Sequence, residues 1–245
     1  MCNVIKSDLN TYRSRKRDSQ KLSNEERELR DNGIVIIKDF MATEDCDINR
    51  NEIENFVNQF NTTTTLENGT FVAFRTEVSN DDADHGMIDV SNIDKSIDTL
   101  RFGHLIPKIE KIISSATYSE VKFFRLNAYI NKGVVGTRGY HVDNFSPNYK
   151  AFIYLTDVID NSYGPYSYIK SSNGLYLGKY LNIYRNSILS ATHRIPDMPK
   201  FYNKNEVINC LGKKGTLVIS DQSGIHRGMP QEPGKTRIAL VLNFK

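Results

Sequence analysis

The sequence is poor in cysteine and has no long hydrophobic run. Its three cysteines, Cys2, Cys46 and Cys210, lack the spacing of a disulfide framework or of a cysteine-ligated metal site. No apolar stretch approaches the length of a membrane span, and residues 1–21 contain no apolar core of signal-peptide length. These absences argue against a disulfide-stabilised scaffold and a membrane span. They predict a cytoplasmic location with reduced thiols.

An excess of charge of one sign is also missing. Against 32 Lys and Arg stand 29 Asp and Glu, which gives a net charge of only +3 over 245 residues. Such a balance does not indicate a nucleic-acid partner. The basic run from Arg13 to Lys21 is interrupted by Asp18 and contains no interleaved aromatic residue. Residues 1–21 are therefore predicted to be a flexible, solvated lead-in.

The remaining composition is that of an ordinary globular domain, with 39% hydrophobic and 25% charged residues. No linker or repeat divides residues 22–245, so we expect a single domain there. Apolar spacing and capping residues predict helices over 22–33, 48–60 and 103–116. In the first helix, Ser23 and Glu26 form a capping-box pattern and Gly33 follows the end. The acidic stretch 78–94 is predicted to be a loop.

From about residue 121 the sequence changes to short segments rich in β-branched and aromatic residues, separated mostly by Gly, Pro, Asn and Asp. Strands are expected within 122–130, 140–144, 150–158, 165–170, 215–220 and 236–244. Many short strands without intervening helices are typical of a jelly roll. The predicted fold is mainly β with flanking helices (α+β): a double-stranded β-helix, cupin-like, with the N-terminal helices packed on one side.

His141 and Asp143 lie two residues apart in "GYHVDN". On a strand, alternate side chains share a face, so the imidazole and the carboxylate would point to the same side. Taken alone, this pair is compatible with a buried hydrogen-bonded pair or with two metal ligands.

Two other residues, later in the chain, favour a metal site. His226 follows the apolar strand "GTLVIS", and Arg237 lies eleven residues later on the last predicted strand. Two imidazoles and one carboxylate form a facial triad that suits non-haem Fe(II) and leaves coordination positions open. A dicarboxylate that chelates iron through one end needs a cation at the other, and a guanidinium binds carboxylate bidentately. His85, His104 and His193 have no such context.

The chain resembles the phytanoyl-CoA dioxygenase family of Fe(II)/2-oxoglutarate oxygenases from about Leu22 to its end. The stretches "GTRGYHVDN" and "GKKGTLVISDQSGIHRGMPQEPGKTRIAL" are similar to the family's His-x-Asp stretch and to its distal His and Arg block. The resemblance implies Fe(2+), 2-oxoglutarate and O2 as cofactors. It implies His141, Asp143 and His226 as iron ligands and Arg237 as the partner of the distal carboxylate of 2-oxoglutarate.

The chain departs from the family pattern at two places. Lys170-Ser171-Ser172-Asn173 stands where the family usually has Pro-Gly-Ser-His, and Gly228 replaces a hydroxyl side chain two residues after the distal histidine. Asn127 and Tyr129 share a face of a predicted strand on which the family often binds 2-oxoglutarate. They are predicted to contact it, against the simpler interpretation of ordinary strand decoration.

The stretch 170–205 is predicted to be a long insertion without regular structure that serves as a lid. Its residues 170–204 contain six basic residues and one acid. Arg185, Arg194 and His193 are candidate contacts to an anionic small-molecule substrate, against the alternative of a solvated loop. The predicted reaction is hydroxylation of a C–H bond with release of succinate and CO2. Desaturation, cyclisation and epimerisation remain alternatives, as does a non-catalytic jelly-roll ligand-binding protein. A halogenase is disfavoured because Asp143 would occupy the halide position. No nucleic-acid or membrane partner is expected.

Overall fold

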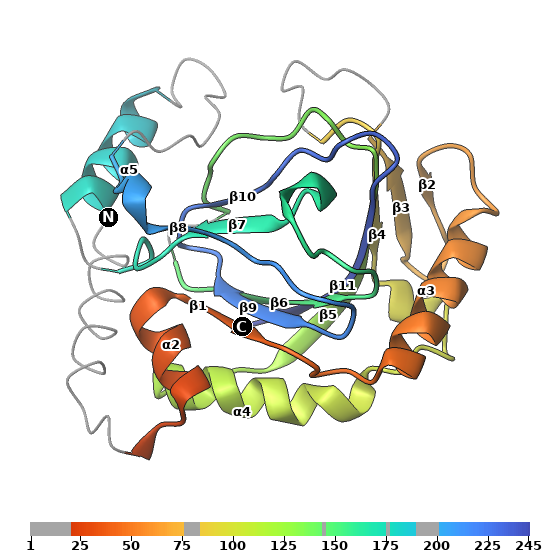
Figure 1. The fold of residues 1–245 in the computed structure, drawn as a ribbon, viewed down its shortest axis with the longest axis horizontal. Helices are drawn as coiled ribbons and strands as arrows, with labels where there is room; N and C mark the ends of the chain where they lie inside the picture. The colour runs from red at the N-terminus through yellow and green to blue at the C-terminus, as the bar shows by residue number, and fades with distance from the viewer. Residues whose placement is uncertain (1–20, 76–83, 144–145, 175–176, 190–200) are drawn as a thin grey trace.

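The computed structural model describes residues 21–75, 84–143, 146–174, 177–189 and 201–245. Within these residues the strands form two antiparallel sheets, an eight-stranded one in the order β1-β9-β6-β11-β5-β4-β3-β2 and a three-stranded one in the order β10-β7-β8 (Figure 1). The strands are β1 (Ile34–Ile37), β2 (Thr64–Thr65), β3 (Phe71–Phe74), β4 (Met87–Ser91), β5 (Phe123–Lys132), β6 (Tyr149–Tyr154), β7 (Tyr166–Ile169), β8 (Val207–Asn209), β9 (Leu217–Asp221), β10 (His226–Gly228) and β11 (Thr236–Phe244).

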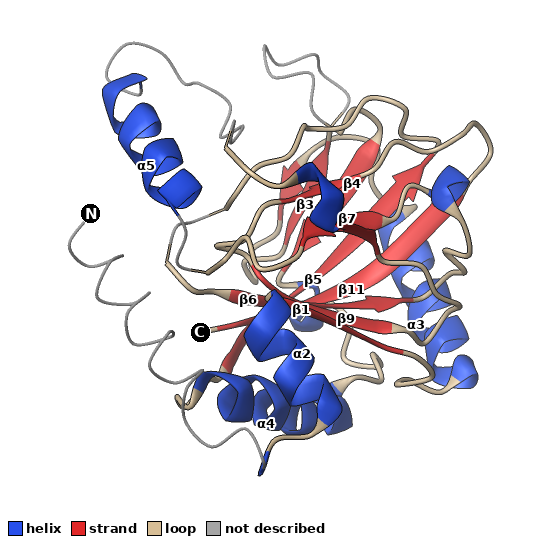
Figure 2. Cartoon of the chain, turned by 60° about the vertical axis from the view of Figure 1, so that its left-hand side comes forward, coloured by secondary structure: helices blue, strands red, loops and turns tan. Residues whose placement is uncertain are grey.

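Helices cover the outer face of the large sheet. The described α-helices are α2 (Asn24–Asn32), α3 (Thr43–Val57), α4 (Ile106–Thr117) and α5 (Leu177–Leu189). Helices α2 and α4 lie together against the large sheet, whereas α5 stands apart on the side of the small sheet (Figures 1 and 2). The first helix begins as predicted, because Ser23 and Glu26 complete a capping box and Gly33 ends it in the left-handed conformation with φ 74°. The N-terminal helices thus pack on one side, as the sequence predicts.

Strand alternation separates two layers of side chains. On β11, Ile238, Leu240 and Leu242 face the helices and join the main hydrophobic core. Ala239 and Val241 point to the opposite face, into a second cluster between the two sheets. The same alternation on β5 and β6 directs one set of side chains to the helical layer and the other set inward. The space between the sheets is therefore lined by residues of every second position on the central strands.

Three local predictions are wrong. The predicted loop 78–94 contains β4, which pairs with β5 from Met87↔Asn131 to Ser91↔Asn127. The stretch is predicted to be a loop because it is acidic, and that composition does not indicate the short strand. The predicted strand 140–144 is reduced to one bridge between His141 and His226, because only that residue finds a partner on β10. The insertion, expected to lack regular structure, contains α5.

Other predictions lie beyond the described residues or are not tested by them. Residues 1–20 are outside the described part of the chain, so the boundary at residue 21 stays a prediction. In the part of the chain that the structure describes, no helix combines the length and the apolar character needed to cross a membrane.

Candidate metal centre

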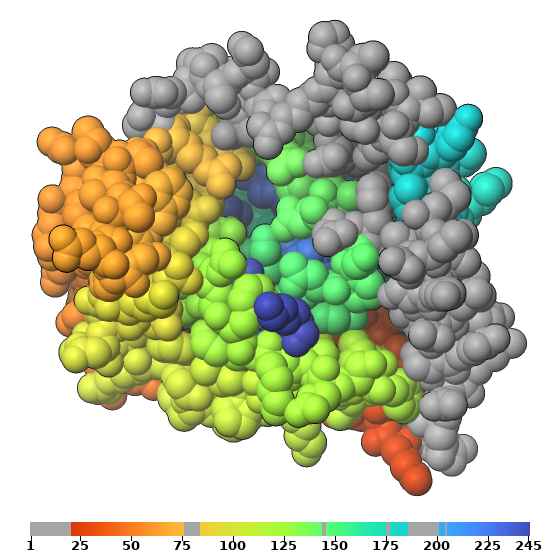
Figure 3. Space-filling view, turned by 180° about the vertical axis from the view of Figure 1, so that it is seen from behind, coloured from red at the N-terminus to blue at the C-terminus, as the bar shows by residue number. Residues whose placement is uncertain are grey.

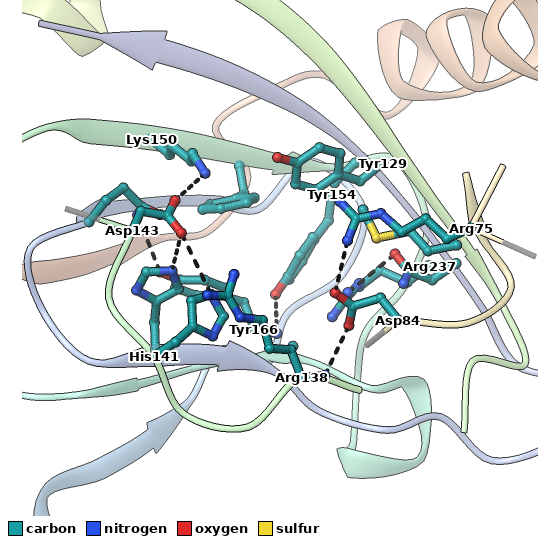
Figure 4. A pocket seen from close by; sticks show the side chains of 17 residues that line it. Arg75, Asp84, Tyr129, Arg138, His141, Asp143, Lys150, Tyr154, Tyr166 and Arg237 are labelled. Carbon is teal, nitrogen blue, oxygen red and sulfur yellow. Dashed lines mark hydrogen bonds and ion pairs between the residues drawn. The ribbon is translucent and has the colours of Figure 1, made fainter. Parts of the chain in front are cut away.

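Three potential metal ligands converge between the two sheets. His141, Asp143 and His226 each offer one ligand atom, and these atoms lie within 4.8 Å of one another. The two histidines are held side by side by a pair of backbone hydrogen bonds, His141 N to His226 O and His226 N to His141 O, both 2.9 Å. Figure 4 shows the carboxylate of Asp143 between Lys150 and His141. Residues 85 positions apart in the sequence thus form one cluster, as the metal hypothesis requires.

The hydrogen bonds of the two imidazoles orient their free nitrogens toward Asp143. His141 Nδ1 lies 2.8 Å from Gly139 O, and His226 Nδ1 lies 2.9 Å from Gly224 O. A carbonyl can only accept, so Nδ1 carries the proton and Nε2 keeps its lone pair. Both Nε2 atoms lie 3.6 Å from Asp143 Oδ1, beyond a normal hydrogen bond. The set of two imidazole nitrogens and one carboxylate oxygen therefore fits an Fe(II) ion placed among them.

The protonation states also suit a cation. Burial and the neighbouring His226 lower the pKa of His141 to about 3, so this imidazole is neutral, the form that binds metal. Burial alone would raise the pKa of Asp143, but His226 and Lys150 hold it well below its usual range. The carboxylate is therefore ionised at neutral pH and offers a negative charge to a metal ion.

Gly224 is a steric requirement of this site. A Cβ at this position would overlap the buried ring of Tyr168, while the carbonyl of Gly224 orients His226. We expect Gly224→Ala to lower the free energy of unfolding by about 1–3 kcal/mol through overpacking, measured by urea denaturation. The control is Gly103→Ala, where an added Cβ meets nothing within 4 Å and the change should stay within about 0.5 kcal/mol. Equal stability of the two variants would contradict this prediction.

A cavity of about 170 Å³ opens beside the triad. In the view from behind, the surface is hollowed between the orange-to-yellow and the green segments, and blue atoms of the C-terminal part are visible inside (Figure 3). The wall is formed by Arg75, Asp84, Met87, Tyr129, Asn131, Arg138, His141, Asp143, Lys150, Phe152, Tyr154, Tyr166, Gln222, His226, Gly228, Arg237 and Ala239. The metal ligands and Arg237 therefore share one cavity.

Arg237 lies in the cavity wall as a half-buried cation. Its guanidinium donates to Gly164 O and, at 3.2 Å, to Asn131 Oδ1. Burial lowers the pKa of Arg237. Among the ion pairs found in the described residues, none joins Arg237 to a carboxylate. The charge of Asp84 nevertheless opposes part of the lowering of the Arg237 pKa. A cation placed in this way favours a carboxylate ligand in the cavity.

The two further residues predicted to contact 2-oxoglutarate are placed differently. Tyr129 lines the cavity, with its ring 6.3 Å from that of Phe152. Asn127 shares the face of Tyr129 on β5 but is not part of the wall, and its buried Oδ1 has no hydrogen-bond partner. The prediction missed Asn131, two residues beyond Tyr129 on the same face, which binds Arg237. The alternation that selected Tyr129 could have found it.

Several charged cavity residues escaped the sequence analysis because they carry no motif. Lys150 Nζ lies 2.6 Å from Asp143 Oδ2. Arg75 pairs with Asp84 and with Asp89, each at 3.4 Å. Asp84 also accepts a hydrogen bond from the backbone N of Arg138. Lys150 lies on β6, and Arg75, Asp84 and Arg138 lie in loops, so only the fold brings them to one wall (Figure 4).

Of the residues predicted to bind the substrate, only Arg185 is described, and it is not part of this wall. Arg185 lies on α5, and none of the described α5 residues lines the cavity. His193 and Arg194 lie outside the described residues. At the first departure from the family pattern, buried Ser172 accepts a hydrogen bond from Ile225 N, and buried Asn173 donates to Asp221. These two residues therefore brace the segment before His226.

The second departure lies beside Arg237. A Cβ added to Gly228 would stand 3.5 Å from Arg237 Nη2, which is ordinary van der Waals contact. A hydroxyl side chain there would lie beside the guanidinium of Arg237. With glycine at this position, Asn131 is the side chain that accepts a hydrogen bond from the guanidinium.

Comparison with known proteins gives no sequence relative but a clear structural likeness. No protein-family model matches the chain and no curated protein is similar to it in sequence, so the phytanoyl-CoA dioxygenase assignment stays a prediction. Among solved structures, the epimerase SnoN in complex with Fe3+, alpha ketoglutarate and nogalamycin RO is 15% identical, with a TM-score of 0.64 over 93% of this chain and 84% of that one. EvdO2 from Micromonospora carbonacea var. aurantiaca, complexed with 2-oxoglutarate, is 14% identical, with a TM-score of 0.65 over 91% of each chain.

EctD from S. alaskensis with bound Fe is similar at a TM-score of 0.60 and 11% identity, over 94% of this chain and 78% of that one. The shared architecture spans nearly the whole chain, and these structures contain iron, 2-oxoglutarate or both. The predicted jelly-roll fold is thus confirmed: this chain has the fold of 2-oxoglutarate-dependent non-haem iron oxygenases.

Proposed function

We propose that the protein is an Fe(II)/2-oxoglutarate-dependent oxygenase of the phytanoyl-CoA dioxygenase type. The observation that carries the proposal is the presence, in one cavity, of a two-histidine, one-carboxylate triad and a guanidinium without a carboxylate partner among the described ion pairs. Neither feature alone is specific. Together they match the two ends of a dicarboxylate that chelates iron at one end and needs a cation at the other.

Bound iron would supply the oxidative chemistry together with 2-oxoglutarate and O2, and the protein provides placement. His141, Asp143 and His226 would hold the ion through Nε2, Oδ1 and Nε2. Arg237 would bind the distal carboxylate, with Asn131 orienting its guanidinium. Phe152, whose ring lies 4.7 Å from that of Tyr166, gives the wall apolar surface near the triad and would exclude water from the reacting centre.

The reaction that we propose is hydroxylation of a C–H bond in a small molecule. We propose an anionic one, because the cations of the wall (Arg75, Arg138, Lys150 and Arg237) outnumber its carboxylates (Asp84 and Asp143). Epimerisation and cyclisation are the second candidate outcome, because the similar structures include an epimerase and the carbocyclase SnoK. Those activities belong to those proteins. We retain Arg185, Arg194 and His193 as proposed substrate contacts only for a substrate that extends beyond the cavity wall.

Anaerobic addition of Fe(II) and 2-oxoglutarate to the purified protein tests the proposal. We expect a visible charge-transfer band that needs both additions, because chelation of iron by a 2-oxo acid creates it. With O2 and a pool of candidate metabolites, we expect succinate release and a product heavier by one oxygen. A protein that binds small molecules but gives neither band nor succinate would be the non-catalytic jelly-roll protein.

A further inference from the structure

The carboxylate of Asp143 is not fixed by regular secondary structure. Its residue follows the single bridge at His141 and belongs to no strand. Its backbone N donates a hydrogen bond to Gln222 O at 3.2 Å, and its side chain is 27% exposed. The histidines, in contrast, are anchored by paired backbone bonds and by their Nδ1 contacts. The direction of the carboxylate therefore depends on what its two oxygens contact.

Those two oxygens have different partners. Oδ2 lies 2.6 Å from Lys150 Nζ, whereas Oδ1 lies 3.6 Å from Nε2 of both histidines. A separation of 2.6 Å between an ammonium and a carboxylate is that of a strong charge-assisted hydrogen bond. Lys150 thus occupies one oxygen and turns the other toward the position where the imidazole nitrogens converge (Figure 4).

Lys150 can act as a rigid support because of its place in the sheet. It is the second residue of β6, paired with Asn243 of β11 on one side and with Ser220 of β9 on the other. A strand flanked on both sides has little freedom, and the Lys150 side chain is only 18% exposed. A loop carboxylate is therefore held by a side chain from the centre of the large sheet.

We propose that Lys150 is a positioning residue of the metal centre, which binds Oδ2 of Asp143 so that this carboxylate coordinates metal through Oδ1 alone. Coordination through one oxygen keeps a position open that a chelating co-substrate and O2 require. Outer contacts of this kind orient ligands and typically change metal affinity by about 10–100-fold when they are removed. This inference rests on the proposed metal function of the triad.

A simpler interpretation gives the opposite result. If Lys150 only neutralised Asp143 in the absence of metal, it would compete with the ion for the carboxylate. Removing a cation from the neighbourhood of a divalent ion would then strengthen metal binding. If Lys150 positions Asp143, removal of the lysine side chain weakens metal binding. The carboxylate is then no longer held in place before the metal binds, and ordering it costs part of the binding free energy. The sign of the change separates the two interpretations.

The experiment titrates Co(II) alone into wild type, Lys150→Met and Lys150→Arg, following the visible d–d bands with and without 2-oxoglutarate. Methionine keeps an unbranched apolar side chain and removes the charge. We expect Lys150→Met to weaken Co(II) binding about 10–100-fold. Its bands should also change, because a carboxylate bound through both oxygens alters the coordination number. Lys150→Arg should recover most of the affinity and the wild-type bands, because a guanidinium also donates to Oδ2.

Lys214→Met is the matched control, since Lys214 Nζ makes a comparable ion pair of 2.7 Å with Asp47 and is not part of the cavity wall. It should bind Co(II) as wild type does. Unchanged or tighter binding by Lys150→Met with wild-type bands would overturn the inference and leave the metal site standing. If wild type itself binds no Co(II), the proposed function fails together with it. Should Lys150→Met not fold, Lys150→Leu carries the same two expectations, because leucine also cannot donate a hydrogen bond to Oδ2.

Discussion

Replacing Asp143 by alanine should abolish metal-dependent turnover. The loss should exceed the roughly 100-fold that removal of an outer contact causes, because a direct ligand is removed. Asp143 provides the only carboxylate in the triad, and two neutral imidazoles alone hold a divalent ion weakly. Succinate release under saturating Fe(II), 2-oxoglutarate and O2 is the measurement, with Co(II) titration as a readout independent of activity.

Asp47→Ala is the control for this variant. Asp47 also pairs with a lysine, Lys214, at 2.7 Å, but it lies on α3 outside the cavity wall. Its variant should keep turnover within about twofold of wild type, an effect of less than 0.5 kcal/mol. Wild-type turnover by Asp143→Ala would remove Asp143 from the site. We do not expect this variant to incorporate chloride, because a halide position must also be shaped by its neighbours.

Replacing Arg237 by alanine should raise the apparent KM for 2-oxoglutarate and leave most of the metal affinity intact. Loss of one partner of a buried charge pair costs on the order of 2–5 kcal/mol, which corresponds to roughly 30-fold or more in affinity. Arg237 donates hydrogen bonds to Asn131 and to a backbone carbonyl in the cavity wall. The measurements are steady-state KM and the 2-oxoglutarate dependence of the anaerobic charge-transfer band.

Two variants sharpen this prediction. Arg237→Lys keeps the charge but loses bidentate geometry, so its KM should lie between those of wild type and Arg237→Ala. Arg101→Ala removes an exposed arginine that pairs with Asp45 at 3.2 Å and should leave KM unchanged. An unchanged KM in Arg237→Ala would mean that another cation holds the distal carboxylate. Lys235, the nearest alternative in sequence, instead stacks on Tyr163, with Nζ 4.4 Å from the ring centroid.

The sequence by itself determined the order of the chemistry-bearing residues and the face of each strand. Arg237 alternates with Ile238 in an apolar strand, so it had to point away from the helical core, and the structure places it in the cavity wall. The ends of α2 could also be predicted, from the capping residues Ser23, Glu26 and Gly33. Strand alternation and helix capping both depend only on residues close together in the sequence. The jelly-roll fold could be predicted because many short strands without helices leave few other architectures.

Only the tertiary structure decided which side chains share the site. Lys150 and Asn131 lie on β6 and β5, which are not neighbours in the sheet but flank β11 on its two sides. Strand order is set by long-range pairing, which periodicity does not encode, so no local pattern could bring Lys150 and Asn131 to the wall of one cavity. The same reason explains the missing strand at 140–144. A strand exists only where a partner offers its backbone groups, and within residues 140–143 only His141 pairs with β10. The sequence indicated the candidate ligands, and the tertiary structure determined which other side chains contact them.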